Sequence, residues 1–179
     1  MSRIGKLPIK VPANVDVICN GLDVTVKGKF GTLENQLPAA LNIKQNDDTL
    51  VVGLENTTRQ NRALHGLYRT LINNMVIGVS EQFEVNLTLK GVGYRAAVQG
   101  KSIVLNLGYS HPVEMEIPEG ISVEVKKNVD ISIKACDKEQ LGLFAAKIRA
   151  WRVPEPYKGK GILYQGEIVK RKAGKSGKK

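Results

Sequence analysis

Apolar and polar residues alternate along most of the chain, which is the pattern of β-strands with one buried face. In the first half, alternation and short apolar runs predict strands at 15–18, 22–26, 32–37, 41–44 and 49–52. In the second half, the same signals predict strands at 83–89, 96–98, 102–107, 113–117, 121–125 and 129–133. Turns such as Asn20-Gly21 and Gln99-Gly100 separate consecutive strands, so we expect antiparallel sheets.

Two stretches change to the helical spacing of three to four residues. The first apolar stripe, which we expect to face a core, comprises Leu64, Leu67, Leu71 and Met75. The second comprises Leu141, Phe144 and Ile148. A capping-box pattern precedes each stripe, at Thr57 with Gln60 and at Asp137 with Gln140. The sequence therefore predicts two capped helices, the first unit ending at Gly78 and the second helix leading into Trp151, whose ring we expect in the core.

Four positions recur at offsets of 79 or 80 residues, which indicates an internal repeat. The pairs are Gly21 and Gly100, Pro38 and Pro118, Thr57 and Asp137, and Gln60 and Gln140. We therefore expect an α+β fold of two tandem repeats, each an antiparallel sheet covered by one helix, with a basic C-terminal tail. The expected domains are an N-terminal repeat at 1–82, a C-terminal repeat at 83–169 and the tail at 170–179.

Positive charge is concentrated near the C-terminal end of the chain. The 179 residues carry a formal net charge of +10, which favours a polyanionic partner. Residues 147–179 contain eleven Lys or Arg and two Asp or Glu, an excess of +9, whereas residues 1–82 contain nine and seven. The tail has no apolar residue larger than Ala, so it cannot form a core, and we expect it to be disordered when free. Ordering against phosphates is the expected function, and a tail that serves only solubility is the alternative. Residues 1–14 also carry basic residues, and this segment either contacts a partner or is a solvated terminus.

The stretch 151–162, which we call the arm, follows the second predicted helix and is rich in Pro and Gly. Its prolines fix φ and favour extended backbone in the residues before them. Tyr157 supplies an aromatic ring, and Lys158 and Lys160 are each followed by a glycine, which permits close backbone approach near two charges. This composition suits contact with a phosphate backbone and a base or sugar. A surface loop with solvated lysines is the alternative.

No group of residues has the spacing of a catalytic, metal or cofactor site. The carboxylates are scattered, and no nucleophile is paired with a base. Cys19 and Cys136 belong to no CxxC pair, so we expect no metal and a reducing compartment. The glycines at 91–93 and 159–161 fit neither a dinucleotide fingerprint nor a Walker loop, so we expect no cofactor. We also expect no signal peptide and no membrane segment.

Three function classes fit these observations. The first is a structural RNA-binding protein, and the second is an enzyme that uses the loop at 158–161 on a small molecule or a phosphate. The third is a general nucleic-acid-binding module. The lack of an acid–base pair weighs against the enzyme. Preference for a folded RNA over duplex DNA of equal length would separate the first class from the third.

Three motifs make the chain strongly resemble the bacterial-type ribosomal protein L6 family of the large subunit. They are Lys90-Gly91-Val92-Gly93-Tyr94-Arg95-Ala96, Gly108-Tyr109-Ser110-His111-Pro112 and Pro154-Glu155-Pro156-Tyr157-Lys158-Gly159-Lys160-Gly161-Ile162. The opening Ser2-Arg3-Ile4-Gly5-Lys6 and the internal repeat match as well, so the resemblance covers the whole chain. The third motif is highly specific.

The resemblance implies two copies of a small sheet-plus-helix fold, no catalysis and a structural role in the large ribosomal subunit. It implies binding to large-subunit rRNA near the sarcin–ricin region, at the base of the stalk where translation factors dock, beside neighbouring ribosomal proteins. It implies no membrane partner and no small-molecule substrate. The expected location is a cytoplasmic ribosome, and a plastid ribosome is the alternative. A non-ribosomal RNA-binding module is the alternative function.

The rRNA-binding residues that the resemblance implies all map to the second repeat and the tail. They are Ser110 and His111 in a turn, Tyr157, Lys158, Gly159, Lys160 and Gly161 in the arm, and Lys170, Arg171, Lys172, Lys175 and Lys178 in the tail. From the residues alone, a plain surface turn is the first interpretation of His111 and phosphate contact the second. These positions agree with the charge excess at the C-terminal end.

Overall fold

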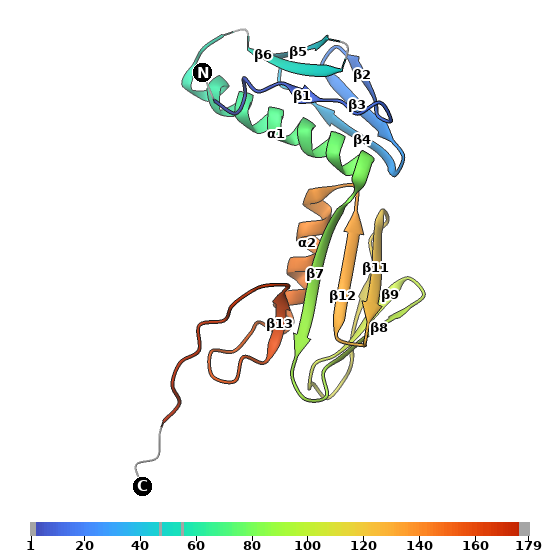
Figure 1. Ribbon diagram of the computed structural model, residues 1–179, viewed down its shortest axis with the longest axis vertical. Coiled ribbons are helices and arrows are strands. Elements are labelled where there is room, and N and C mark those ends of the chain that lie inside the picture. The colour runs from blue at the N-terminus through green and yellow to red at the C-terminus, as the bar shows by residue number, and fades with distance from the viewer. Residues whose placement is uncertain (1–2, 47, 55, 176–179) are drawn as a thin grey trace. The chain divides into compact units, whose positions relative to one another are not determined.

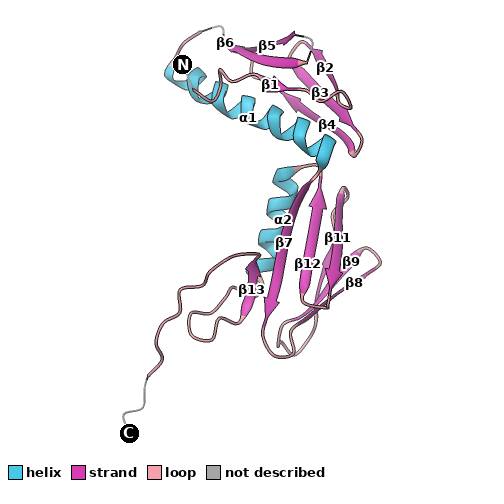
Figure 2. Cartoon of the chain, in the orientation of Figure 1, coloured by secondary structure: helices cyan, strands magenta, loops and turns pink. Residues whose placement is uncertain are grey.

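The structure is a computed structural model that describes residues 3–46, 48–54 and 56–175 (Figure 1). The chain divides into two compact units. Unit 1 contains the chain up to Phe83 together with Cys136–Lys138, and unit 2 contains Glu84–Ala135 and the chain from Glu139 onward. Antiparallel strands and one helix recur in the two halves, which confirms the predicted α+β fold class (Figure 2).

Unit 1 combines two three-stranded sheets with the helix α1. Its elements are β1 (Ile9–Lys10), β2 (Asp16–Asn20), β3 (Asp23–Gly28), β4 (Gly31–Gln36), β5 (Leu41–Asn46), β6 (Thr49–Leu54) and α1 (Arg59–Glu81). The strands pair in the orders β2-β3-β4 and β1-β6-β5. Asn20 lies opposite Asp23 in the β2–β3 hairpin. The hairpin turns at Gly21, whose φ of 64° is readily adopted by glycine.

The buried face of α1 has a different phase from the predicted stripe. Its buried residues are His65, Ile72, Met75, Val76, Gly78 and Val79. Leu67 is 51% exposed, so the prediction that it faces the core is wrong. The cause is His65, which a sequence pattern counts as polar. Its Nε2 donates to the backbone oxygen of Val52 at 2.8 Å, and this bond allows the ring to be buried.

Both ends of α1 also differ from the prediction. The N-cap is Thr58 rather than Thr57, because the Thr58 Oγ1 accepts a hydrogen bond from the Asn61 amide at 3.1 Å. The helix continues through Gly78 to Glu81. Gly78 is needed inside the helix because a Cβ there would overlap the backbone oxygen of Cys136. The predicted end at Gly78 is therefore wrong.

The N-terminal segment belongs to unit 1 rather than forming a free arm. Ile9 in β1 lies opposite Leu50 of β6 and is 1% exposed. The guanidinium of Arg69 on α1 donates to the backbone oxygens of Leu7 and Pro8 at 3.1 and 3.2 Å. Strand β1 has only two residues, which is too short to produce an alternating pattern in the sequence.

Unit 2 repeats the topology of unit 1. Its elements are β7 (Phe83–Lys90), β8 (Arg95–Gln99), β9 (Ser102–Asn106), β10 (Val113–Glu116), β11 (Ile121–Lys126), β12 (Asp130–Ala135), α2 (Lys138–Ala150) and β13 (Gly161–Tyr164). Only the first residues of β7 and α2, Phe83 and Lys138, fall in unit 1. The orders β8-β9-β10 and β7-β12-β11 correspond to β2-β3-β4 and β1-β6-β5. The predicted stripe of α2 is confirmed, since Leu141, Phe144 and Ile148 are buried.

Strand β13 is the element that unit 1 lacks among the described residues. It pairs antiparallel with β7, with Ile162 opposite Leu89, and it lies at the edge of the sheet β11-β12-β7-β13. The sequence pattern did not predict this strand because it directly follows a stretch of prolines and glycines. Its position fixes one end of the arm, which runs from the end of α2 into β13 and is therefore attached to the folded unit at both ends (Figure 1).

Candidate nucleic-acid interface

The arm is a loop closed by its own backbone. The Ile162 amide donates to the Arg152 backbone oxygen at 2.8 Å, and the Glu155 amide donates to the Lys160 backbone oxygen at 3.0 Å. The two bonds bring the outgoing and returning halves of the arm together. Tyr157 and Lys158 therefore lie at the far end of a fixed loop rather than on a loose segment.

Two glycines allow the backbone of the arm to adopt its loop conformation. Gly161 has a φ of 148°, and a Cβ there would lie 2.6 Å from the Cα of Pro154. Gly159 has a φ of 71°, in the left-handed region that favours glycine. Both glycines are buried, unlike the lysine between them and the lysine before them. The two glycines would therefore influence binding to a partner indirectly, because their backbone conformation sets the positions of Lys158 and Lys160.

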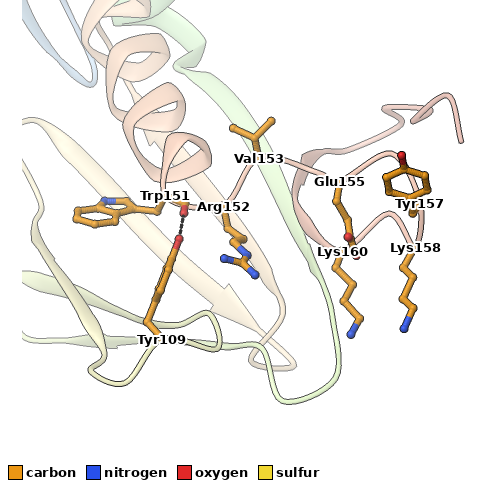
Figure 3. Close-up of a pocket in the computed structure, with 8 residues that line it drawn as sticks. All are labelled: Tyr109, Trp151, Arg152, Val153, Glu155, Tyr157, Lys158 and Lys160. Atoms are coloured by element: carbon orange, nitrogen blue, oxygen red, sulfur yellow. Dashed lines mark hydrogen bonds between the residues drawn. The ribbon is translucent and has the colours of Figure 1, made fainter. Parts of the chain in front are cut away.

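A shallow pocket of about 560 Å³ opens beside the arm (Figure 3). Its lining residues are Tyr109, Trp151, Arg152, Val153, Glu155, Tyr157, Lys158 and Lys160. Figure 3 shows the side chains of Lys158 and Lys160 pointing the same way. Within the described ranges, neither lysine has a side-chain hydrogen bond or ion pair. Tyr157 is 58% exposed. The pocket thus offers two free ammonium groups and an aromatic ring.

The turn containing Ser110 and His111 lies next to the arm. The Tyr109 hydroxyl donates to the backbone oxygen of Trp151 at 2.6 Å (Figure 3). Ser110 and His111 are exposed and line a second hollow together with Tyr109 and Trp151. The structure therefore brings the predicted turn and the predicted arm onto one surface, although Tyr109 and Trp151 are 42 residues apart in sequence.

The beginning of the tail lies on the arm. The Lys172 amide donates to the Pro156 backbone oxygen at 2.8 Å. The Arg171 guanidinium lies against Gly159, 3.4 Å from where a Cβ of that glycine would be. The side chains of residues 170–175 are exposed, whereas Lys178 lies outside the described residues. Three of the predicted basic residues, at 170–172, are thus placed close to the arm.

Two arginines near the arm have intramolecular partners. Arg149 forms an ion pair with Glu167, with 2.8 Å between Nη2 and Oε1. Arg152 donates from Nε to the Tyr94 hydroxyl at 3.1 Å, and its Cζ lies 5.3 Å from the centre of the Tyr109 ring. The Tyr109 and Tyr94 side chains next to its guanidinium raise the pKa of Arg152 above its ordinary value. Counting charges in the sequence does not distinguish these arginines from the free lysines.

Trp151 is not a core residue. Its side chain is 46% exposed, and its indole N–H points at the sulfur of Met115 at 3.1 Å. The prediction that this ring closes the core is wrong, because α2 ends at Ala150 and the chain turns there toward the arm. The residues that sequence reasoning missed are Tyr94, Tyr109 and Arg152. Their only sequence signal was their place in or beside the resemblance motifs.

In the part of the chain that the structure describes, no group of His, Cys, Asp or Glu side chains could hold a metal ion. Nor is any helix within those ranges long and apolar enough to cross a membrane. Of the two histidines, His65 is bonded inside the core of unit 1 and His111 lies in the exposed turn. The surface beside the arm can therefore supply charge, aromatic stacking and hydrogen bonds.

Fold and surface together define a protein of two duplicated α+β units, one of which presents a fixed cationic and aromatic loop. The sequence profile of the family described as ribosomal protein L6 matches residues 11–82 and 90–165. The chain belongs to the ribosomal protein L6 family. Membership confirms the resemblance and the predicted class, a structural and non-enzymatic ribosomal protein.

Similar proteins match over their full length. The large ribosomal subunit protein uL6c of Trieres chinensis is 73% identical over 179 residues, covering all of both chains. The protein of the same name from Phaeodactylum tricornutum is 69% identical over 178 residues, covering 99% of this chain and all of the other. Large ribosomal subunit protein uL6 of Clostridioides difficile is 58% identical over 180 residues and likewise covers both chains completely.

Proposed function

We propose that this chain is a structural component of the large ribosomal subunit and binds its rRNA through unit 2. The proposed site on the RNA is the sarcin–ricin region at the base of the stalk, beside the place where translation factors dock. Neighbouring ribosomal proteins of the stalk base are the proposed protein partners. Family membership and the names of the full-length relatives support the subunit, and the resemblance of the arm motif supports the RNA region.

The observation that carries this proposal is the pair of free lysines on the closed arm. Lys158 and Lys160 have no side-chain partner among the described residues and flank the same pocket as Tyr157. Ammonium groups neutralise phosphates, and an exposed tyrosine can stack on an unpaired base or a sugar. Because the loop is closed by two backbone hydrogen bonds, little ordering is needed when RNA binds.

The remaining predicted residues extend the proposed surface on both sides of the arm. Ser110 and His111 can donate hydrogen bonds to phosphate or ribose oxygens from one side. Lys170, Arg171, Lys172 and Lys175 supply further positive charge from the other, and Lys178, which lies outside the described residues, adds to the charge of the tail. Gly159 and Gly161 contribute through the loop geometry that their φ values permit. The surface would thus fix the local RNA fold by neutralising crowded phosphates.

We further propose that the ribosome in question is a plastid ribosome. Three relatives between 68% and 73% identical carry the plastid name uL6c, including the one from Thalassiosira pseudonana. The bacterial relatives from Clostridioides difficile and Nostoc sp. are 58% and 55% identical. The higher identity to plastid proteins favours the plastid over the bacterial cytoplasm as the location.

Binding to an rRNA fragment that contains the sarcin–ricin stem–loop tests the proposal. Lys158→Glu with Lys160→Glu should weaken binding at least about tenfold, because two phosphate contacts become repulsive. Lys27→Glu with Lys29→Glu is the matched control: it has the same spacing and changes the net charge equally, but on unit 1. Equal losses from both pairs would mean that only net charge matters, and the proposed interface would be wrong.

A further inference from the structure

Arg152 lines the pocket but is held quite differently from the two lysines. Its Nε donates to the Tyr94 hydroxyl at 3.1 Å, and its guanidinium lies over the Tyr109 ring at 5.3 Å. The Tyr109 hydroxyl in turn donates to the backbone oxygen of Trp151 at 2.6 Å. We call these three side chains the tyrosine–arginine cluster. They form a connected set of contacts within unit 2.

The cluster joins three loops that are far apart in sequence. Tyr94 belongs to the bend after β7, Tyr109 to the turn after β9, and Arg152 to the start of the arm. Tyr94 is itself fixed, because its ring is buried and a Cβ at Gly91 would lie 2.9 Å from that ring. The Arg152 backbone oxygen accepts the bond from Ile162 that closes the arm. The position of the arm therefore depends on the cluster.

We propose that Tyr109 and Arg152 are positioning residues for RNA binding, which hold the arm and the Ser110–His111 turn together as one surface. This inference rests on the proposed function of that surface. Fixing two loops before binding reduces the ordering cost of association. The inference also gives Arg152 a role other than phosphate contact. A planar guanidinium can stack on one tyrosine and hydrogen-bond another, whereas a lysine of equal charge cannot reproduce both contacts.

Two substitutions that keep the net charge test the proposal. Tyr109→Phe removes the hydroxyl but keeps the ring under Arg152, and Arg152→Lys keeps the charge but removes the planar group. Each should weaken binding of the rRNA fragment roughly threefold to tenfold, the size of one ordinary hydrogen bond. The dependence of affinity on salt should stay unchanged, because both variants keep every proposed phosphate contact.

Hydrogen exchange in the free chain gives a readout that does not involve RNA. Exchange at the Ile162 and Glu155 amides, which close the arm, should be faster in both variants. Tyr164→Phe is the control. It removes a tyrosine hydroxyl from the same unit, and that hydroxyl has no hydrogen-bond partner within the described ranges. It should leave both exchange and RNA affinity as in the wild type.

Three results would decide against the proposal. Wild-type affinity in Arg152→Lys would mean that only the charge of Arg152 matters. Wild-type affinity in Tyr109→Phe would mean that the hydrogen bond from Tyr109 to Trp151 does not contribute to RNA binding. Unchanged amide exchange in both variants would show that the cluster does not fix the arm. Failure of the proposed function is separate: it would appear as wild-type affinity after Lys158→Glu with Lys160→Glu.

Discussion

Four cationic side chains of the α2 end and the arm divide by residue type. Arg149 pairs with Glu167, and Arg152 contacts two tyrosines, whereas Lys158 and Lys160 have no side-chain partner within the described residues. A guanidinium suits fixed, multiple contacts, and an ammonium on a flexible stem keeps its charge available. Affinity for phosphate should therefore follow the free lysines rather than the total number of positive residues.

A residue-scale prediction concerns the phase of α1. Ile72→Ala should lower the free energy of unfolding by about 2–5 kcal/mol, because Ile72 is 0% exposed and its removal leaves a cavity. Leu67→Ala is the matched control and should change it by less than about 0.5 kcal/mol. Chemical denaturation of the two variants measures both values. A large loss at Leu67 with none at Ile72 would contradict the orientation of this helix.

The phase of α1 also shows why an apolar pattern alone does not determine which face of a helix is buried. The spacing of Leu64, Leu67, Leu71 and Met75 is as regular as that of the residues that are buried. The competing face includes His65 and Gly78, which no apolar pattern selects. Burial of His65 depends on a hydrogen bond to Val52, thirteen residues away, and a helical pattern contains no information about that bond.

At the scale of elements, strands were predictable where one face is buried and the strand is long enough to alternate. β3, β7 and β9 satisfy both conditions, and the predicted and observed bounds agree closely. β1 has two residues and β13 follows a Pro- and Gly-rich stretch, so neither produces alternation. The lysines of the candidate site were predictable from composition. The tyrosine–arginine cluster was not, because it joins loops that only the tertiary fold brings together.

The tail is the element whose contribution can be measured separately. Truncation after Val169 removes six basic residues and should flatten the salt dependence of rRNA binding, by roughly 0.7–0.9 in log–log slope for each phosphate that the tail neutralises. The measurement is the affinity for the rRNA fragment across a salt series. A slope equal to that of the wild type would mean that the tail binds no phosphate.

A shorter truncation separates charge from support of the arm. Ending the chain after Lys172 keeps the Lys172 amide bond to Pro156 and the packing of Arg171 against Gly159. This variant should have a flatter slope than the wild type and keep the affinity that persists at high salt. Truncation after Val169 should reduce that residual affinity too, because the arm then lacks both supports.

At the scale of the whole molecule, two units of the same topology differ in charge and in one added feature. Residues 1–82 carry an excess of only two positive charges, and within the described residues unit 1 has no counterpart of β13 and the arm. Unit 2 carries the arm, the turn and the tail on one compact body. A duplication in which one copy acquired the proposed RNA-binding loop accounts for both the repeated topology and the asymmetry of charge.

Lysine acetylation, followed by mass spectrometry, tests most directly the proposal that unit 2 rather than unit 1 binds the RNA. The chain would be labelled free in solution and again after assembly into large ribosomal subunits. We expect strong protection of Lys158, Lys160, Lys170, Lys172 and Lys175 in the subunit. Lys27, Lys29 and Lys44 of unit 1 should react nearly as in the free chain. Protection of these unit 1 lysines, with the arm and tail lysines still reactive, would contradict the assignment of unit 2 as the RNA-binding half.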